Sequence, residues 1–208
     1  MNPLSALENV TPDMVEDLEA LVMAETPTSD VGAIERGAEL LSEMGKRLLG
    51  DGPEVIRTSD RPHLLWKLGK PSVMLLGHLD TVWARGTTER WPFSVSNGIA
   101  SGPGCFDMKA GLVQGLYAAS VLSEMDGIAF LVTTDEEIGG HSSRELIENV
   151  ARDVQAVLVL EPSGSGSVKI ARKGASFYEI TFRGRAAHAG LDPEKGSNAL
   201  IQLAHVVR

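Results

Sequence analysis

The stretch Ser72–Asp80, which reads SVMLLGHLD, organises the rest of the chain. Its apolar residues favour β-structure and end in turn residues, which is typical of a buried strand that stops at Gly77. His78 and Asp80 therefore follow a predicted central strand at its carboxyl end, where open α/β sheets bind ligands. In extended backbone the two side chains point the same way, so the Asp80 carboxylate can accept one imidazole N–H and leave the other nitrogen for a metal. A purely structural histidine is the alternative for this motif alone.

The composition indicates a globular protein with an acidic surface. The chain has 208 residues, 43% of them hydrophobic, a net charge of −9 and a pI near 5.0. These values predict one ordinary domain plus part of another, and they argue against nucleic acid or an anionic membrane as partner. The single cysteine, Cys105, excludes an intramolecular disulfide and fits a reducing compartment. No signal-peptide pattern and no apolar run of roughly 18 residues is present, so we expect a cytoplasmic protein.

Helical and strand patterns alternate along the chain, which predicts an α/β architecture. The predicted helices span residues 11–25, 31–49, 108–124 and 142–150, and Thr11 is the expected cap of the first. The predicted strands span residues 54–58, 63–68, 72–77, 128–134 and 154–160. Between residues 81 and 104 the sequence has no sustained period, and such a long irregular connection is usually functional.

Acidic residues recur where the predicted strands end. Asp135, Glu136 and Glu137 follow the strand 128–134, and Glu161 follows the strand 154–160. Asp107 stands just ahead of a predicted helix, where an N-cap is the simpler interpretation. A solvated acidic turn is likewise the simpler interpretation of residues 135–137. The convergence of these acids with His78 on one edge of a sheet favours a metal site instead.

One imidazole and several carboxylates form a nitrogen and oxygen ligand set that suits zinc, with cobalt or manganese as alternatives. Four acids exceed what one tetrahedral ion needs, so two ions that share a carboxylate would use the surplus. A water held between two ions would become a nucleophile near neutral pH, and an acid not bound to metal would take its proton. Glu136 and Glu137 are neighbours whose side chains diverge, so one can bind metal while the other serves as base. The pattern predicts metal-assisted hydrolysis.

Five segments carry a resemblance to a known family. GHLDTVW, GPGCFDMKAG, TTDEEIGG, LEPS and RAAHAG occur in this order and resemble the co-catalytic zinc metallopeptidases and deacylases, most closely the glutamate carboxypeptidase branch. The resemblance implies a three-layer, doubly wound catalytic domain of the zinc exopeptidase type over residues 1–166. It implies the start of an inserted α+β, ferredoxin-like lid and dimerisation domain over residues 167–208. It also implies a non-proline cis peptide just after the bridging acid, between Asp107 and Met108.

The same resemblance implies a role for each candidate residue and a requirement for two zinc ions. His78 and Glu161 bind one zinc, Glu137 binds the other, and Asp107 bridges both. Glu136 is the general base and acid, and Asp80 orients His78.

His188, in the AAHAG segment, matches the family histidine that reaches the partner subunit's active site in a homodimer and polarises the scissile carbonyl. A surface histidine at a strand end is the alternative for this residue. The remaining histidines match no family motif and are expected to be structural or surface residues: His63, His141 and His205.

We therefore expect a hydrolase that cleaves an amide or peptide bond in a small peptide or N-acyl amino acid and releases a carboxyl-terminal residue such as glutamate. An inactive fragment or pseudoenzyme that keeps the fold as a metal-binding or dimerisation module is the alternative. The presence of Glu136 favours the interpretation as an enzyme, because a protein that only binds metal needs no general base. Family members are longer and supply a last histidine ligand, so these 208 residues alone are expected to be inactive.

Overall fold

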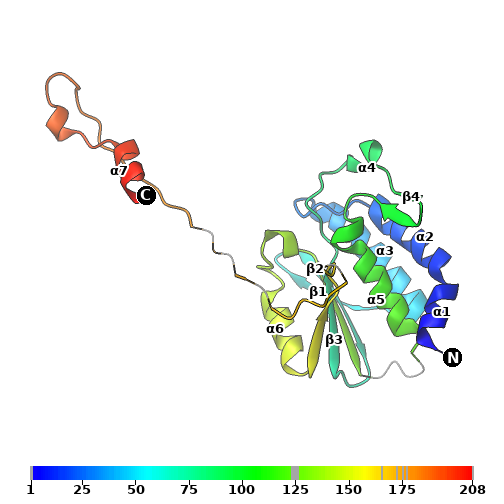
Figure 1. The fold of residues 1–208 in the computed structure, drawn as a ribbon. Helices are drawn as coiled ribbons and strands as arrows, with labels where there is room; N and C mark the ends of the chain where they lie inside the picture. Colours follow the sequence, from blue (N-terminus) through cyan, green and yellow to red (C-terminus); the bar gives the residue numbers. More distant parts are fainter. Residues whose placement is uncertain are drawn as a thin grey trace. The chain divides into compact units, whose positions relative to one another are not determined.

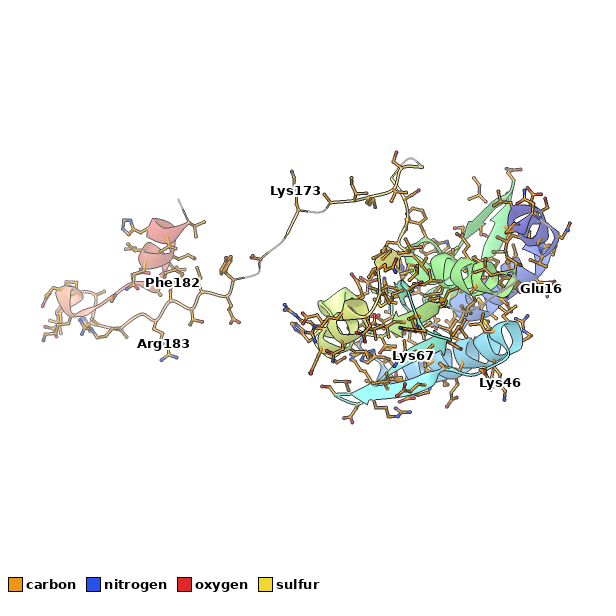
Figure 2. The ribbon with its side chains drawn as sticks, turned by 90° about the horizontal axis from the view of Figure 1, so that it is seen from below. Glu16, Lys46, Lys67, Lys173, Phe182 and Arg183 are labelled. Atoms are coloured by element: carbon orange, nitrogen blue, oxygen red, sulfur yellow. The ribbon has the colours of Figure 1, made fainter. Side chains whose placement is uncertain are left out.

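The structure is a computed structural model that describes residues 2–122, 127–164, 166–171, 173–174, 176 and 178–207. Contacts between residues divide the chain into two compact units, Met1–Gly166 and Ser167–Arg208. In the first unit a sheet carries helices on both faces (Figure 1). Exposed charged side chains cover the outside of this unit, among them Glu16, Lys46 and Lys67, which are labelled in Figure 2.

Four helices of the first unit begin within two residues of their predicted positions, namely α2 (Thr11–Met23), α3 (Val31–Leu49), α5 (Ala110–Ser120) and α6 (Arg144–Arg152). The helices α1 (Pro3–Asn9) and α4 (Thr87–Arg90) were not predicted. Asp30 caps α3 by accepting a hydrogen bond from the backbone N–H of Ala33 at 2.9 Å. The prediction that Thr11 caps α2 is wrong. Because α1 runs almost directly into α2, Val10 takes the N-cap position and Thr11 lies inside the first turn.

The main sheet has five strands, namely β1 (Glu54–Thr58), β2 (Arg61–Leu68), β3 (Val73–His78), β6 (Ile128–Thr133) and β7 (Ala156–Val159). Their order is β1-β2-β6-β3-β7, so the sheet is mixed: β6 and β7 run parallel to β3, whereas β1 and β2 pair antiparallel. His78 lies opposite Thr133, and Leu76 lies opposite Val159. The segments that follow β3, β6 and β7 therefore leave the sheet at the same edge.

The core has one part on each face of the sheet. Trp66 and Phe130 pack with α2, α3 and α5 on one face, and their ring centroids lie 5.8 Å apart. Leu65 and Leu131, on the other face, pack against α6. Figure 1 shows α6 on one side of the sheet and α2, α3 and α5 on the other. The predicted three-layer α/β fold is thus confirmed.

The connection between β3 and α5 is more regular than predicted. It contains α4 and a hairpin of β4 (Ser94–Ser96) and β5 (Ile99–Ser101). Asn97 and Gly98 form the turn with φ angles of 53° and 76°, and Asn-Gly is the strongest short signal for such a two-residue hairpin. The sequence interpretation missed this signal. The predicted helix 108–124 is also shorter, because α5 ends at Ser120 and residues 123–126 lie outside the described residues.

The second unit contains the short turn η3 (Pro193–Lys195) and helix α7 (Ala199–Val206). The β-rich stretch predicted between residues 168 and 190 forms, among its described residues, only an isolated bridge between Arg185 and Ser197. Residues 172, 175 and 177 of that stretch lie outside the described residues. None of the helices that the structure describes combines the length and the apolar character needed to cross a membrane.

Candidate metal centre

The candidate site lies where three parallel strands end. His78 is the last residue of β3, Glu136 and Glu137 form the single turn η2 (Glu136–Ile138) after β6, and Glu161 follows β7. Since β6 and β7 both pair parallel to β3, these residues emerge at one edge of the sheet. Asp107 comes to the same place from the turn η1 (Cys105–Lys109) ahead of α5.

His78 is the centre of this cluster. Its side chain is only 2% exposed, and Nε2 lies 3.1 Å from Asp107 Oδ1, 3.2 Å from Glu161 Oε1 and 3.9 Å from Glu136 Oε2. Nδ1 lies 2.9 Å from the backbone carbonyl oxygen of Asp80 and 3.5 Å from Asp80 Oδ1. The shorter contact of Nδ1 is thus with the carbonyl of Asp80 rather than with its carboxylate. Both oxygens are acceptors, so Nδ1 carries a proton and Nε2 is the nitrogen that a cation would bind.

The Asp80 carboxylate, which is fully buried, makes two of its hydrogen bonds with the turn that carries the two glutamates. Oδ1 accepts a hydrogen bond from the backbone N–H of Glu136 at 3.2 Å, and Oδ2 accepts one from that of Glu137 at 3.3 Å. The hydroxyl of Thr28 donates to Oδ2 at 2.9 Å. Asp80 therefore connects the histidine to η2, a link that the spacing of His78 and Asp80 alone did not reveal.

Asp107 is not a helix cap. The N-cap position of α5 belongs to Lys109, and Asp107 has extended backbone angles (φ −122°, ψ 99°) inside the kinked turn η1. The Asp107–Met108 peptide bond is cis, as the family resemblance implied. The Asp107 side chain is 57% exposed and lies beside His78, so the N-cap interpretation is wrong.

The charges of the cluster alter its pKa values. Burial lowers the pKa of His78, but hydrogen bonds with Asp80 and Glu161 and the charges of Asp80 and Glu136 outweigh burial and raise it to about 11. Burial raises the pKa of Glu136, and the charges of Glu161, Asp80 and Asp107 raise it further against the opposing effect of His78. Burial and the charge of Asp107 likewise raise the pKa of Glu137. The excess of negative charge favours a cation at this place.

The donor atoms fit a transition-metal ion. Ligand atoms of His78, Asp107 and Glu137 lie within 4.8 Å of one another, and so do those of His78, Glu136 and Glu161. Donors around a tetrahedral zinc lie about 3.4 Å apart, close to the distances of His78 Nε2 from Asp107 and Glu161. The two groups share His78, and its one available nitrogen can bind only one ion.

The first acid of the TTDEEIGG segment, Asp135, has a structural role. Asp135 is buried, and its Oδ2 accepts hydrogen bonds from the backbone N–H of Ser142 at 2.6 Å and from the Ser142 hydroxyl at 2.7 Å. The three adjacent acids therefore do not share one site. The two serines that follow Gly139 and Gly140 are the sequence signal for such a closed turn.

Two basic side chains that support the site, a buried lysine and a half-buried arginine, were not singled out from the sequence. Lys109 is 1% exposed and donates from Nζ to the carbonyl of Leu21 at 2.8 Å, which ties η1 to α2. Burial lowers the pKa of Lys109 to about 7 against the opposing charge of Glu25. Arg61 donates to the carbonyls of Thr134 and Thr28, both at 2.7 Å, and so connects the end of β6 to the loop ahead of α3.

His188 belongs to the second unit. Its Nδ1 accepts hydrogen bonds from the backbone N–H groups of Gly190 at 3.2 Å and Leu191 at 3.1 Å. With Nδ1 occupied as an acceptor, the proton of the neutral ring lies on Nε2, which is exposed and free to donate.

Comparison with known proteins identifies similar chains. The profile of peptidase family M20/M25/M40 matches residues 74–207. Carboxypeptidase G2 of Pseudomonas sp. (strain RS-16) is 32% identical over 94% of this chain and 50% of its own length. The succinyl-diaminopimelate desuccinylase of Anaplasma marginale (strain Florida) is 29% identical over 85% of this chain and 50% of its own length. The chain therefore spans about half the length of these curated relatives.

Solved structures share the fold at lower identity. Aminopeptidase PepT from Bacillus cereus superposes with a TM-score of 0.63 at 21% identity, over 93% of this chain and 55% of its own. An M20 family metallo-carboxypeptidase from Sulfolobus solfataricus superposes with a TM-score of 0.57 at 20% identity, over 79% of this chain and 38% of its own.

Proposed function

The chain belongs to peptidase family M20/M25/M40, and on that premise we propose that it is a metal-dependent hydrolase of amide or peptide bonds. Its substrate is a small peptide or an N-acyl amino acid, from which it releases a carboxyl-terminal residue such as glutamate. The names of the relatives, a carboxypeptidase and a desuccinylase, support an amide bond next to a carboxylate-bearing residue.

One observation carries this proposal. Asp107 Oδ1 and Glu161 Oε1 lie 3.1 Å and 3.2 Å from His78 Nε2, on a buried imidazole whose other nitrogen is held by Asp80. Carboxylates that are gathered around one imidazole repel one another, and a cation that joins them removes this repulsion. A ligand set of this composition suits zinc, with cobalt or manganese as alternatives.

The proposed ligand assignment has His78 and Glu161 on one zinc, Glu137 on a second, and Asp107 shared between them. It is supported by Asp107, which is close to His78 and also falls in one ligand group with Glu137. When bound, the two zinc ions would polarise the substrate carbonyl and acidify a water molecule between them.

Glu136 is the proposed general base and acid. Its Oε2 lies 3.9 Å from His78 Nε2, farther than the oxygens of Asp107 and Glu161, and its side chain is 55% exposed. Burial and the neighbouring carboxylates raise the pKa of Glu136 above its ordinary value, which is the direction that suits a general base and acid. Glu136 would take the proton of the attacking water and give it to the leaving nitrogen.

His188 is proposed to donate from Nε2–H to the scissile carbonyl in the partner subunit of a homodimer. The support from this chain is the pair of backbone N–H groups that occupy Nδ1 and leave Nε2–H as the donor. We further propose that the enzyme works in the cytoplasm.

The test is a metal and activity assay on the same preparation. A chain of the relatives' full length that contains these residues is stripped with a chelator and supplied with zinc, cobalt or manganese. Bound metal is measured alongside hydrolysis of N-acyl-glutamates, dipeptides and N-succinyl amino acids. We expect metal-dependent hydrolysis, and loss of both metal and hydrolysis in His78→Ala. Metal binding without hydrolysis would favour the inactive module instead, and hydrolysis that survives the chelator would contradict the proposal.

A further inference from the structure

His63, which matches no family motif, lies at the base of the turn that carries Glu136 and Glu137. It belongs to β2, opposite Ile56 of β1, and its side chain is fully buried. Leu64 and Leu65 follow it in the strand. A polar ring at a buried sheet position has an unfavourable desolvation free energy that leucine would not have. The hydrogen bond that His63 makes is therefore the feature to explain.

The turn in question runs from Asp135 to Ser143 and is closed by Asp135 itself. Asp135 Oδ2 accepts hydrogen bonds from the backbone N–H of Ser142 at 2.6 Å, from the Ser142 hydroxyl at 2.7 Å and from the backbone N–H of Ser143 at 3.3 Å. The carbonyl of Asp135 accepts a hydrogen bond from the N–H of Gly140 at 2.9 Å. These bonds hold the two ends of the turn together, with both glutamates between them.

The geometry assigns the direction of each hydrogen bond. His63 Nε2 lies 3.2 Å from Ser142 Oγ. Asp135 Oδ2 already accepts hydrogen bonds from the backbone N–H groups of Ser142 and Ser143, so it faces Ser142 Oγ as an acceptor. The single hydroxyl proton of Ser142 goes to Asp135, and Ser142 Oγ must then accept from His63. The imidazole therefore carries a proton on Nε2.

We propose that His63 is a positioning residue which, through Ser142 and Asp135, holds the turn that bears Glu136 and Glu137. Asp80 binds the same turn at the N–H groups of Glu136 and Glu137. The turn is thus fastened at two places, at its start by Asp80 and at its closing residues by His63. The proposal rests on the proposed function only for the roles of the two glutamates.

Hydrogen exchange in the full, metal-free chain tests the positioning directly. His63→Leu removes the donor, Ser142→Ala removes the hydroxyl, and His63→Gln keeps an N–H donor at a similar reach. We expect the backbone amides of residues 136–143 to exchange about fivefold faster in His63→Leu, which corresponds to the loss of one typical hydrogen bond. Exchange should be faster still in Ser142→Ala, because the lost hydroxyl makes two hydrogen bonds. His63→Gln should restore exchange to the wild-type rate.

Two controls separate local loosening from general loss of stability. His141→Gln replaces an exposed histidine in the same turn and should leave exchange unchanged. The amides of β6, next to the turn, report global opening. Equal acceleration in β6 and in the turn, or a turn in Ser142→Ala that exchanges at the wild-type rate, would overturn the proposal. If His63→Leu fails to fold, Ser142→Ala and His63→Gln still decide the question.

Zinc affinity, measured by competition with a chelating dye, tests whether the turn affects the proposed metal centre. We expect weaker zinc binding in His63→Leu and wild-type binding in His63→Gln and His141→Gln. A wild-type chain that binds no zinc would contradict the proposed function but would leave the exchange result to decide on His63. Wild-type zinc affinity in His63→Leu, together with faster turn exchange, would overturn the link between the turn and the metal centre.

Discussion

Asp80 Oδ1 accepts a hydrogen bond from the backbone N–H of Glu136 at 3.2 Å, across 56 positions of sequence. The same carboxylate holds Glu137 through Oδ2, while the carbonyl of Asp80 lies against His78. One buried residue thus sets the distance between the imidazole and both glutamates. A side chain in this position would affect metal binding without being a ligand, because it orients the proposed ligands.

Asp80→Asn should weaken zinc binding while leaving the ligand residues in place. The amide has a single acceptor oxygen, which cannot serve Glu136, Glu137 and Thr28 as the carboxylate does. We expect zinc affinity to fall by about 10- to 100-fold, the usual effect of losing a residue that orients ligands. Competition with a chelating dye measures the affinity.

Asp60→Asn is the matched control for this change. Asp60 is exposed in the turn between β1 and β2, and its φ of 64° is well tolerated by asparagine. Zinc affinity should be unchanged in Asp60→Asn, and equal affinity in the two variants would show that Asp80 does not orient the site.

Glu136→Gln and Glu137→Gln should fail in different ways. A base that is not a ligand can be lost without loss of metal, so Glu136→Gln should keep its zinc while turnover falls by about 10²- to 10⁴-fold. Glu137→Gln should mainly lose metal. Metal content and turnover, measured on both variants of a full-length enzyme, decide between the roles, and loss of zinc from Glu136→Gln would reverse the assignment.

The stability of the protein should depend on pH through His63. Burial lowers the pKa of His63 below its ordinary 6.5, and the charge of Arg61 lowers it further against Asp135 and Asp80. As the pH falls through 6.5 the unfolded chain binds a proton that the folded chain does not, so the free energy of unfolding decreases. The slope from this one group is at most about 1.4 kcal/mol per pH unit.

His63→Gln should therefore lose less stability than the wild type between pH 7 and pH 5, as urea unfolding at a series of pH values would measure. His141→Gln, which removes an exposed histidine from the same turn, is the control. Parallel curves for the wild type and His63→Gln would contradict the role of burial at this position.

Gly45→Ala should destabilise the fold. A Cβ at Gly45 would lie 2.3 Å from Cζ2 of Trp66, where α3 packs against β2. Such overpacking costs about 1–3 kcal/mol, which outweighs the roughly 1 kcal/mol that alanine gains over glycine inside a helix. Urea unfolding measures the net loss.

Gly32→Ala in the same helix provides the comparison. Its added Cβ would meet no atom closer than 3.5 Å, so the helix propensity of alanine should act alone and stabilise the protein by up to about 1 kcal/mol. Equal stability of Gly45→Ala and Gly32→Ala would show that Trp66 and α3 can separate without loss.

The pattern of apolar residues in the sequence correctly predicted where the strands of the sheet end. The predicted strand 54–58 agrees with β1, and the strands ahead of His78, Asp135 and Glu161 are present within a few residues of their predicted bounds. A buried strand leaves a local signal, because apolar residues must fill both faces of a short segment. The hairpin of β4 and β5 also left a local signal, Asn97-Gly98, that was not used.

The sequence by itself determined which residues end the strands, and hence that one histidine and several acids meet at one edge of a sheet. Only the tertiary structure decided which oxygen faces which nitrogen. Asp80 to Glu136, Thr28 to Asp80 and His63 to Ser142 join positions more than 50 residues apart. Such contacts depend on strand order and on the path of each turn, and neither leaves a periodic trace in the chain.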